Sequence, residues 1–577
     1  MVVHLCLQLA APEHALAQPV ALQVRIVAPA PLDKLFADNL DIVRWSARGP
    51  LARDQIDQLY ATAAPQMREL AATEGYFTPR VGASLEYSDG TFIARFKVEP
   101  GTPTRVTQIE LSVIGAVTQD KDGPMRIEQA RRAFGLEQGD IFRQADWVAG
   151  KERMVGSLGR LRYATARVDD SRAEIDPDAH AAALRVVVNS GPAVTLGAPQ
   201  IIGLQRYPSS VVTNLNLILP GSPYDEAKLL KYQRRLQATG YFASALVTAS
   251  PSRDQPRDTP IMVAVAEAPA RRVELGLGYS TDRGARAQVR YTDRNFGSHA
   301  WKLSSELYAD QLVQTGSLGL TFPRRADGWQ YGVEGRLEAQ DIQNQNVKYW
   351  STTAGRTYTV EEYESGLALQ YLSEVSTLPD ATRTRPEALF LNQRWLWNTL
   401  DDPINPRRGH TFQLQLGGAV QQLLSTQSFG RAHLRGNYLL PVTEHLTLSL
   451  RGELGLVLAD SPQGIPSVYV FRTGGDTSIR GYPFDSLGVP QGGAVVGGRY
   501  LVVGSVELTR WITREWGVAV FVDGGNAWDD LGAFEPAFGY GAGARWRSPI
   551  GSLSLDVAYG EQRDDWRISF TAGIVFR

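Results

Sequence analysis

The sequence has almost no cysteine, no marked excess of charge and no long apolar run. A single cysteine, Cys6, in 577 residues excludes a disulfide scaffold and every site that needs several thiolates. The 59 basic and 61 acidic side chains leave a formal charge of −2, so no global basic field favours nucleic acid. No run of 18 apolar residues occurs. This excludes a helical membrane protein but not a β-barrel, whose lipid face uses only alternate residues.

The signatures of common enzymes are also missing. There is no His-Glu-x-x-His metal motif, no Walker loop and no Gly-x-Ser-x-Gly nucleophile elbow, and the seven histidines are scattered. The glycine-rich segment 539–543 lies in a strand pattern with no following helix, so it predicts tight packing in a sheet rather than a dinucleotide loop. We therefore expect no enzyme activity, no cofactor and no bound metal.

Residues 1–19 resemble a signal peptide. Met1 to Leu9 are mostly apolar, and Ala15-Leu16-Ala17 has the small-x-small form of a cleavage site. The usual basic n-region is absent. The alternative interpretation is the disordered start of a cytosolic protein.

From residue 20 to residue 268 the chain alternates helix-like and strand-like segments. One helix face is predicted by apolar residues at steps of three and four, namely Ile56, Leu59, Ala63, Met67 and Leu70. Pro65 is expected to kink or split that helix.

This half also repeats itself. A helix end, an aromatic residue and a strand recur around Tyr76, Tyr163 and Tyr241, which lie 87 and then 78 residues apart. Each unit ends in a strand followed by a proline-bearing joint. The recurrence predicts three α+β domains, at 20–100, 101–190 and 191–268.

From residue 269 to residue 577 helical spacing disappears and the period becomes two. In the last segment six apolar residues share one parity: Trp566, Ile568, Phe570, Ala572, Ile574 and Phe576. A soluble sandwich of two sheets gives the same alternation. Segments of about ten to twelve residues, with tryptophans near their ends, favour a transmembrane β-barrel instead.

The alternation predicts sixteen strands, an even number as in bacterial outer-membrane barrels. The expected strands are 271–280, 285–296, 301–310, 314–323, 329–341, 347–360, 361–372, 388–399, 410–420, 430–440, 446–458, 499–511, 516–525, 537–547, 552–560 and 566–577. The predicted fold is thus a set of α+β repeats followed by an all-β membrane domain.

One connection is unusually long, and it carries a motif. Forty residues separate Leu458 from Arg499, and they include the run GGDTSIRGY at 474–482. Loops of this length are commonly functional. Together with DDPINPRRG at 401–409 and FVDGGN at 521–526, this run resembles the ordered motifs of the BamA/TamA superfamily of outer-membrane assembly factors. The three preceding repeats resemble polypeptide-transport-associated (POTRA) domains, so the resemblance covers nearly the whole mature chain.

The resemblance implies a loop tip, Arg480, Gly481 and Tyr482, that folds back into the barrel lumen. Glu507 and Asp523 have the parity opposite to their apolar neighbours, so both carboxylates are expected to face the lumen from neighbouring strands. The planar, multi-donor guanidinium of Arg480 suits such a pair of acids better than lysine does. The alternative for this loop is a solvated turn.

Closure of the barrel is expected between the first and last strands. The first strand contains Gly276 and Gly278, and the last contains Gly573 and Phe576. Glycines weaken a strand, which predicts that this seam is the weakest ladder of the barrel. In the superfamily such a seam is thought to let client strands pass sideways. The alternative is that these glycines accommodate curvature.

The resemblance further implies location in the outer membrane of a Gram-negative bacterium, with the POTRA domains in the periplasm. The implied activity is the insertion or secretion of client outer-membrane proteins such as autotransporters, with strand capture on the POTRA domains. Three repeats place the chain nearest the TamA branch, which implies an inner-membrane-anchored, TamB-like partner and contact with outer-membrane lipid, but no nucleic acid. The alternatives are a passive channel, a two-partner-secretion-type transporter and a secreted, soluble β-rich binding protein.

Overall fold

The computed structural model describes residues 19–402, 405–548 and 551–576, with side chains up to residue 572. The expected signal peptide, apart from its last residue, lies outside the described residues. The chain forms two compact units. The first contains Met1–Gln200, Ile218–Lys231 and Thr248–Met262, and the second contains Ile201–Leu217, Tyr232–Val247 and Val263–Arg577.

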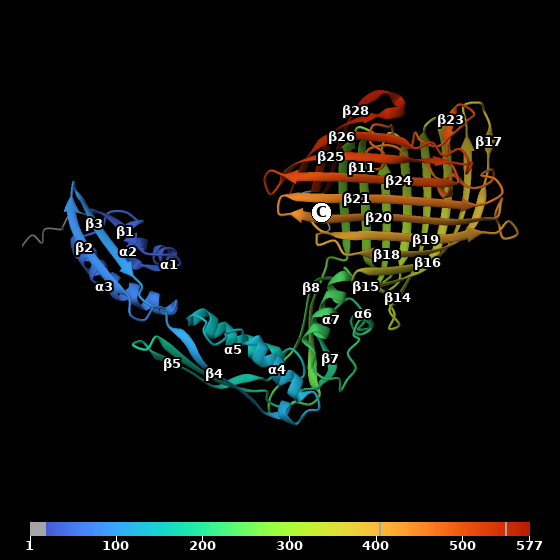
Figure 1. The fold of residues 1–577 in the computed structure, drawn as a ribbon. Helices are drawn as coiled ribbons and strands as arrows, with labels where there is room; N and C mark the ends of the chain where they lie inside the picture. Colours follow the sequence, from blue (N-terminus) through green and yellow to red (C-terminus); the bar gives the residue numbers. More distant parts are fainter. Residues whose placement is uncertain (1–18, 403–404, 549–550, 577) are drawn as a thin grey trace, which may run out of the picture. The chain divides into compact units, whose positions relative to one another are not determined.

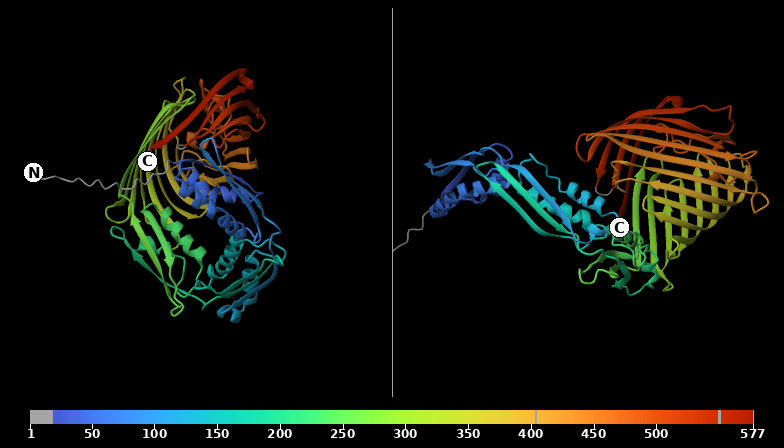
Figure 2. Two further views of the ribbon diagram at one scale, coloured as in Figure 1. Left: turned by 90° about the vertical axis from the view of Figure 1, so that its left-hand side faces the viewer. Right: turned by 60° about the horizontal axis from the view of Figure 1, so that its bottom comes forward.

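The N-terminal half forms three small sheets, each with three strands and with helices packed against one face (Figures 1 and 2). The first has the order β1-β3-β2 and contains β1 (Ala21–Val27), α1 (Leu32–Asn39), α2 (Asp41–Ser46), α3 (Arg53–Thr73), β2 (Arg80–Ser88) and β3 (Thr91–Glu99). The second has the order β4-β6-β5 and contains β4 (Arg105–Ile114), α4 (Gly123–Ala133), α5 (Gln144–Gly159), β5 (Arg167–Asp176) and β6 (Ala181–Asn189). The third has the order β7-β9-β8 and contains β7 (Leu196–Ile202), α6 (Ser210–Thr213), α7 (Glu226–Ala238), β8 (Phe242–Ala249) and β9 (Thr259–Glu267).

The first and second small domains each have their own apolar core. In the first, alternate residues of the central strand, such as Phe92 and Phe96, pack with Ile56 and Met67 of α3. The prediction that Pro65 splits this helix is wrong, because α3 runs through it without a break. Pro65 is exposed, so the carbonyl that loses its N–H partner there faces water rather than the core.

The C-terminal half is a closed antiparallel barrel, as the sequence predicts, and not a sandwich of two sheets (Figure 1). Sixteen strands cross it, and the two-residue β17 (Arg383–Thr384) adds a short ladder to β16. The spanning strands are β10 (Arg271–Ser280), β11 (Gly284–Phe296), β12 (Trp301–Ala309), β13 (Val313–Thr321), β14 (Trp329–Ile342), β15 (Gln345–Val360), β16 (Tyr363–Thr377), β18 (Glu387–Asn398), β19 (Gly409–Ala419), β20 (Phe429–Thr443), β21 (Leu446–Leu458), β24 (Tyr500–Trp511), β25 (Trp516–Trp528), β26 (Ala537–Ser548), β27 (Gly551–Gly560) and β28 (Asp565–Phe576). No helix in the described ranges is long and apolar enough to cross a bilayer.

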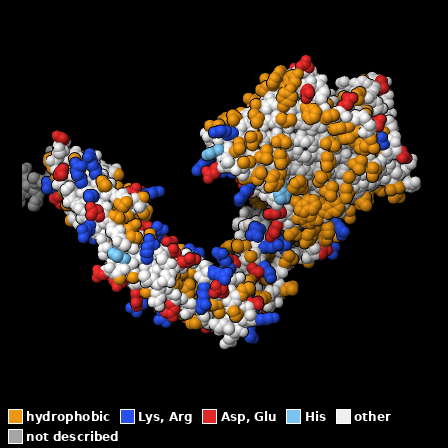
Figure 3. All heavy atoms as spheres, in the orientation of Figure 1, with side chains coloured by type: hydrophobic (Ala, Val, Ile, Leu, Met, Phe, Trp, Pro, Cys, Tyr) orange, Lys and Arg blue, Asp and Glu red, His pale blue; other side chains and the backbone are white. Residues whose placement is uncertain are grey.

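The outer wall of the barrel is apolar, whereas its inner wall carries both charged and apolar side chains. On β25 Val518, Val520 and Val522 are 53–57% exposed, whereas Phe521 and Asp523 between and beside them are buried. Figure 3 shows hydrophobic side chains gathered over the barrel wall. The strand alternation therefore separates an apolar outer surface, as expected of a membrane barrel, from the lumen.

The barrel has two rims. We call the rim with turns 297–300, 322–328 and 361–362 the proximal rim, and the rim with turns 281–283, 310–312 and 343–344 and the connection 459–499 the distal rim. Within the second unit, Tyr241 Oη donates a hydrogen bond to the Ala300 carbonyl at 2.6 Å, and Asn214 Nδ2 donates one to the Arg324 carbonyl at 3.0 Å. Part of the third small domain is therefore bonded to the proximal rim.

Candidate functional site

The long connection between β21 and β24 folds into the barrel. It contains a short hairpin, β22 (Val489–Gln491) and β23 (Ala494–Val496). Its apolar side chains share one core with inward-facing residues of the wall, namely Ile465, Tyr469, Phe471, Ile479 and Tyr482 with Phe390, Phe429, Leu501 and Val503. We call residues 459–499 the plug loop.

Arg480 is the centre of the contact between the plug loop and the wall. Its Nε and Nη2 atoms donate to the two carboxylate oxygens of Asp523 at 2.7 and 2.9 Å, and its Nη1 donates to Glu507 Oε2 at 2.6 Å. Its backbone N–H also donates to Asp523 at 3.1 Å. The structure thus brings together Arg480 and both acids named from the sequence, and the bidentate geometry is one that lysine cannot reproduce.

Three further side chains complete a cluster of alternating charge. Arg545 donates to Glu507 Oε2 at 2.7 Å and to Asp556 Oδ1 at 2.6 Å. Arg451 Nη2 donates to the Ser478 carbonyl at 2.8 Å and lies 3.7 Å from Asp523. With Arg480, Glu507 and Asp523 these residues form a balanced set of three guanidinium groups and three carboxylates, which we call the lumen cluster.

The lumen cluster is shielded from water. The side chain of Arg480 is 5% exposed and that of Asp523 is 0% exposed. Burial opposes the charge of Arg480, but the hydrogen bonds and charges of Asp523 and Glu507 outweigh it and raise the pKa of the guanidinium. The Phe521 ring centroid lies 3.3 Å from Arg480 Cζ, so the cation also rests on an aromatic face.

Glycines allow the tip to approach the wall closely. A Cβ atom on Gly539 of β26 would lie 1.9 Å from the Arg480 carbonyl oxygen. Gly481 has a φ of +94°, and a Cβ there would lie 2.8 Å from the backbone nitrogen of Gly560. Any side chain at these two positions would push the tip away from β26 and β27.

Tyr482 fixes the other side of the tip. Its hydroxyl is hydrogen-bonded to the side chain of Gln562 and donates to the Phe538 carbonyl at 3.2 Å. The Gln562 backbone N–H donates back to the same hydroxyl at 3.1 Å. The three tip residues are therefore held by the strands from β24 to β27 and by the turn before β28.

The opposite wall holds the plug loop at other points. Ser467 donates through both its backbone N–H and its hydroxyl to Glu374 Oε2 of β16, at 2.9 and 2.8 Å. The turn between β14 and β15 contributes Gln343, whose Nε2 donates to the Phe484 carbonyl at 2.7 Å and whose carbonyl accepts from the Val495 N–H at 3.1 Å. The plug loop therefore crosses the lumen from wall to wall.

The seam between β10 and β28 is short. Among the residues that the structure describes, these strands pair from Leu275 opposite Phe576 to Ser280 opposite Thr571, whereas β10 pairs with β11 along its whole length. Gly278 lies opposite Gly573 and Gly276 lies opposite Val575. A Cβ atom on Gly278 would lie 2.3 Å from Arg286 Nε, so this glycine leaves room for an arginine of the next strand.

The plug loop also contacts the distal end of the seam. The Asp476 N–H donates to Asp282 Oδ2, just after β10, at 2.6 Å. Arg567 of β28 donates to the other oxygen of Asp282 at 2.8 Å. One carboxylate thus links the plug loop, the first strand and the last strand.

The contact at Asp476 is expected to depend on pH. Burial raises the pKa of the Asp476 carboxyl from 3.8 to about 6, and the nearby carboxylate of Asp282 adds to the rise. The contribution of the protonated group to loop docking is therefore full below pH 3.8 and is lost as the pH rises through about 6. In planar bilayers the intact protein is expected to be silent apart from brief openings, which should be more frequent at pH 8 than at pH 5, with a smaller difference in Asp476→Asn. Asp460 is an exposed residue of the same loop, so Asp460→Asn should show the wild-type difference in opening frequency between pH 8 and pH 5. An equal loss of this difference in both variants would contradict the role given to Asp476.

The two other sequence motifs lie in a turn and in a strand. In the proximal turn between β18 and β19, Asp401 accepts hydrogen bonds from the N–H groups of Arg407 and Arg408 at 2.9 and 3.2 Å. Residues 403–404 of that motif lie outside the described residues. The run 521–526 lies in β25 and supplies Asp523 to the lumen cluster and Phe521 as the ring beside Arg480. In the part of the chain that the structure describes, no group of three or more His, Cys, Asp or Glu side chains is arranged to hold a metal ion.

Sequence reasoning missed Arg545 and Asp282 and gave no role to Asp556, Arg451 and Arg567. Parity places Arg451 and Asp556 on the inner face, since both alternate with apolar residues. It does not pair them with a partner, because pairing depends on the register between strands.

The comparisons with known proteins agree on the kind of protein that this chain resembles. The Omp85 superfamily domain matches residues 270–576, and a POTRA domain described as a surface antigen variable number repeat matches residues 194–268. The outer membrane protein assembly factor BamA of Nitratidesulfovibrio vulgaris is 22% identical over 542 residues, covering 89% of this chain and 66% of the relative. The crystal structure of BamA from Haemophilus ducreyi lacking POTRA domains 1–3 is 18% identical with a TM-score of 0.65, and the match covers 82% of this chain and 100% of that one.

Proposed function

The chain belongs to the Omp85 superfamily, and on this premise we propose that it inserts or translocates client proteins of the outer membrane. The barrel lies in the outer membrane of a Gram-negative bacterium, and the small domains that precede it lie in the periplasm. The proximal rim is therefore the periplasmic rim, and the distal rim faces the outside of the cell.

One observation carries the proposal: the plug loop is bonded both to the lumen cluster and to the distal end of the seam. Arg480 binds acids of β24 and β25, while Asp476 binds Asp282, which in turn binds Arg567 of β28. Movement of the loop tip would therefore take away one of the two partners of Asp282, the carboxylate that links the first and last strands. The short ladder between them would then open more readily than any other and offer an edge to a client strand.

The periplasmic domains supply edges of a second kind. In each sheet the central strand is covered on both sides, while the outer strands, for example β2 in the first sheet, leave unpaired backbone groups. An extended client segment can add to such an edge by main-chain hydrogen bonds. We propose that autotransporter-like clients are captured in this way, and that a TamB-like partner anchored in the inner membrane uses another of these edges.

An engineered, reversible disulfide bond across the seam tests this function. Ser280 and Thr571 are paired across the seam, so Ser280→Cys with Thr571→Cys places two thiols opposite each other. In proteoliposomes the oxidised variant is expected to lose client insertion, and reduction of the disulfide should restore it. The measurement is the fraction of a client barrel that becomes protease-resistant.

The matched control has a disulfide bond between two other strands of the barrel. Ser304 and Gly319 are paired between β12 and β13, three ladders away from the seam, and cysteines there should leave insertion unchanged in both redox states. Full insertion by the oxidised seam variant would exclude passage through the seam. Equal loss in both locked variants would indicate that the barrel must deform as a whole.

A further inference from the structure

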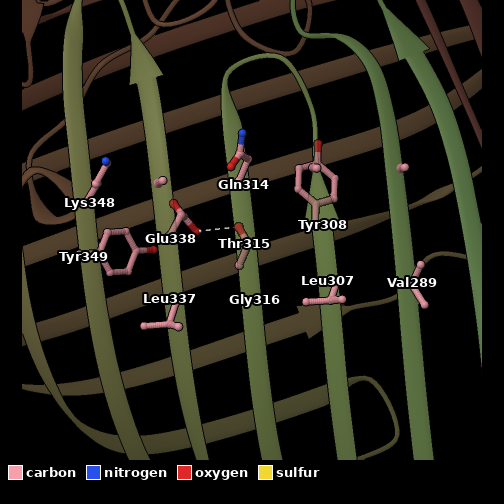
Figure 4. Close-up of a pocket in the computed structure, with 13 residues that line it drawn as sticks. Val289, Leu307, Tyr308, Gln314, Thr315, Gly316, Leu337, Glu338, Lys348 and Tyr349 are labelled. Carbon is pink, nitrogen blue, oxygen red and sulfur yellow. Dashed lines mark hydrogen bonds between the residues drawn. The ribbon is translucent and has the colours of Figure 1, made fainter.

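The lipid-facing wall has a hollow that the proposed function does not use. It lies over strands β11 to β15 and has a volume of about 590 Å³, within the range of about 300–1,000 Å³ typical of ligand sites. Figure 4 shows Val289, Leu307 and Leu337 in one row across it, with Lys348 and Gln314 nearer the strand ends. Val289, Leu307 and Leu337 are 42–66% exposed, so the hollow opens on the outer surface of the barrel.

Strand register explains why the wall is hollow there. Gly316 of β13 lies directly between Leu307 and Leu337, and an added Cβ would meet only Leu307 Cδ2, at 3.7 Å. The next row toward the outside of the cell contains Ala309 beside Gln314 and Ala339. Missing or small side chains in two adjacent rows leave a trough between the two leucines.

The cationic side chain of Lys348 lies at the outer end of the trough. Lys348 lies opposite Ala339 in the alanine row, and its side chain is exposed. In the ranges 19–402, 405–548 and 551–576 its ammonium group forms no ion pair, and the acid nearest in register on this face, Asp341, lies opposite Asn346 instead. Trp350, two residues closer to the membrane centre on the same face, is 45% exposed, which is typical of the membrane interface.

The wall behind the trough is closed. Thr315 and Glu338 face the lumen, and Thr315 Oγ1 donates to Glu338 Oε2 at 3.1 Å (Figure 4). A molecule in the trough therefore meets hydrocarbon and the headgroup layer but not the lumen.

We propose that this trough binds one anionic lipid of the outer leaflet. An acyl chain lies over Gly316 between Leu307 and Leu337, and the phosphate of the headgroup accepts hydrogen bonds from the Lys348 ammonium and the Gln314 amide. An unpaired lysine at the border of the hydrocarbon layer reaches for the headgroups, and a phosphate there gives it a counter-charge. The apolar trough and the cation at its end thus select a lipid rather than a soluble anion.

Native mass spectrometry of the full chain in a neutral detergent tests the site. The probes are phosphatidylglycerol and phosphatidylcholine with identical saturated chains. The wild-type protein should retain phosphatidylglycerol preferentially, and Lys348→Gln should weaken its binding about tenfold, as expected for the loss of one charge-assisted hydrogen bond. Lys348→Arg should keep the preference. Gly316→Leu, or Ala309→Leu from the neighbouring strand, should reduce binding of both lipids by filling the trough.

Two controls match these changes. Arg510 of β24 is an exposed cation at the periplasmic rim, so Arg510→Gln removes the same charge elsewhere. Gly335 of β14 faces outward into open space outside the trough, so Gly335→Leu adds the same side chain elsewhere. Both controls should bind like the wild type. Unchanged phosphatidylglycerol binding by Lys348→Gln or by the trough-filling variants, or displacement of the lipid by inorganic phosphate, would overturn the proposal.

Discussion

Replacing Arg480 with alanine is expected to lower the free energy of unfolding by about 3–5 kcal/mol, the range for breaking a buried ion pair by removing one partner. The variant leaves Asp523, which is 0% exposed, without its bidentate partner, while Glu507 keeps Arg545 and the hydroxyl of Thr509. Arg480→Lys should recover part of the loss, because an ammonium group restores the charge but not the planar fork. Urea unfolding in detergent, followed by tryptophan fluorescence, measures the change.

Another luminal pair provides the control for this prediction. Arg290 and Glu306 are joined at 2.6 Å, but their side chains are 45% and 30% exposed, so Arg290→Ala should cost only about 0–1 kcal/mol. Similar losses in Arg480→Ala and Arg290→Ala would show that burial of the lumen cluster adds nothing. A double variant, Arg480→Met with Asp523→Asn, should be more stable than Arg480→Ala, because it removes one charge of each sign and leaves two guanidinium groups and two carboxylates in the lumen cluster.

Deleting residues 460–498 is expected to convert a silent protein into a large, steady pore. Barrels of about 16 strands enclose an aqueous channel unless something fills it, and here the plug loop crosses the lumen between β16 and the lumen cluster. Planar-bilayer conductance of the intact and shortened chains measures the effect. Deleting residues 421–424, which are exposed in another outer loop, should leave the protein silent.

The same recording separates the insertion machine from a passive channel. A large, steady pore in the intact protein would favour the channel, since a plugged barrel cannot conduct in this way. Silence in the shortened protein would show that the plug loop is not the barrier.

Which side of the wall a residue faces could be predicted from the sequence, and which residues meet could not. The alternation around Val522 and Leu508 assigns Asp523 and Glu507 to the lumen, and the structure places both there. The partnership of Arg545 with Asp556 needs the register of β26 against β27, and a period of two carries no register. The trough over Gly316 depends on register across five strands, so no local pattern reveals it.

The long-range contacts of the plug loop could not be predicted from the sequence either. The motif around Arg480 indicates that the tip enters the lumen, but nothing near Asp476 in the sequence points to Asp282, which is 194 residues away. Such a contact exists only because closure of the barrel brings the first and last strands together. Pro65 illustrates the opposite error. A local rule predicted a break in the helix, but the helix continues, because an exposed helix face tolerates a proline.

The plug loop is rooted at both ends in strands that pair with each other, with Leu456 of β21 opposite Tyr500 of β24. A tip that leaves its site therefore stays within reach, and its return is a first-order step with an effective concentration on the order of millimolar. Diluting the protein in the membrane should not change the fraction of closed molecules. The barrel can thus reset after each opening without a second component and without an external source of energy.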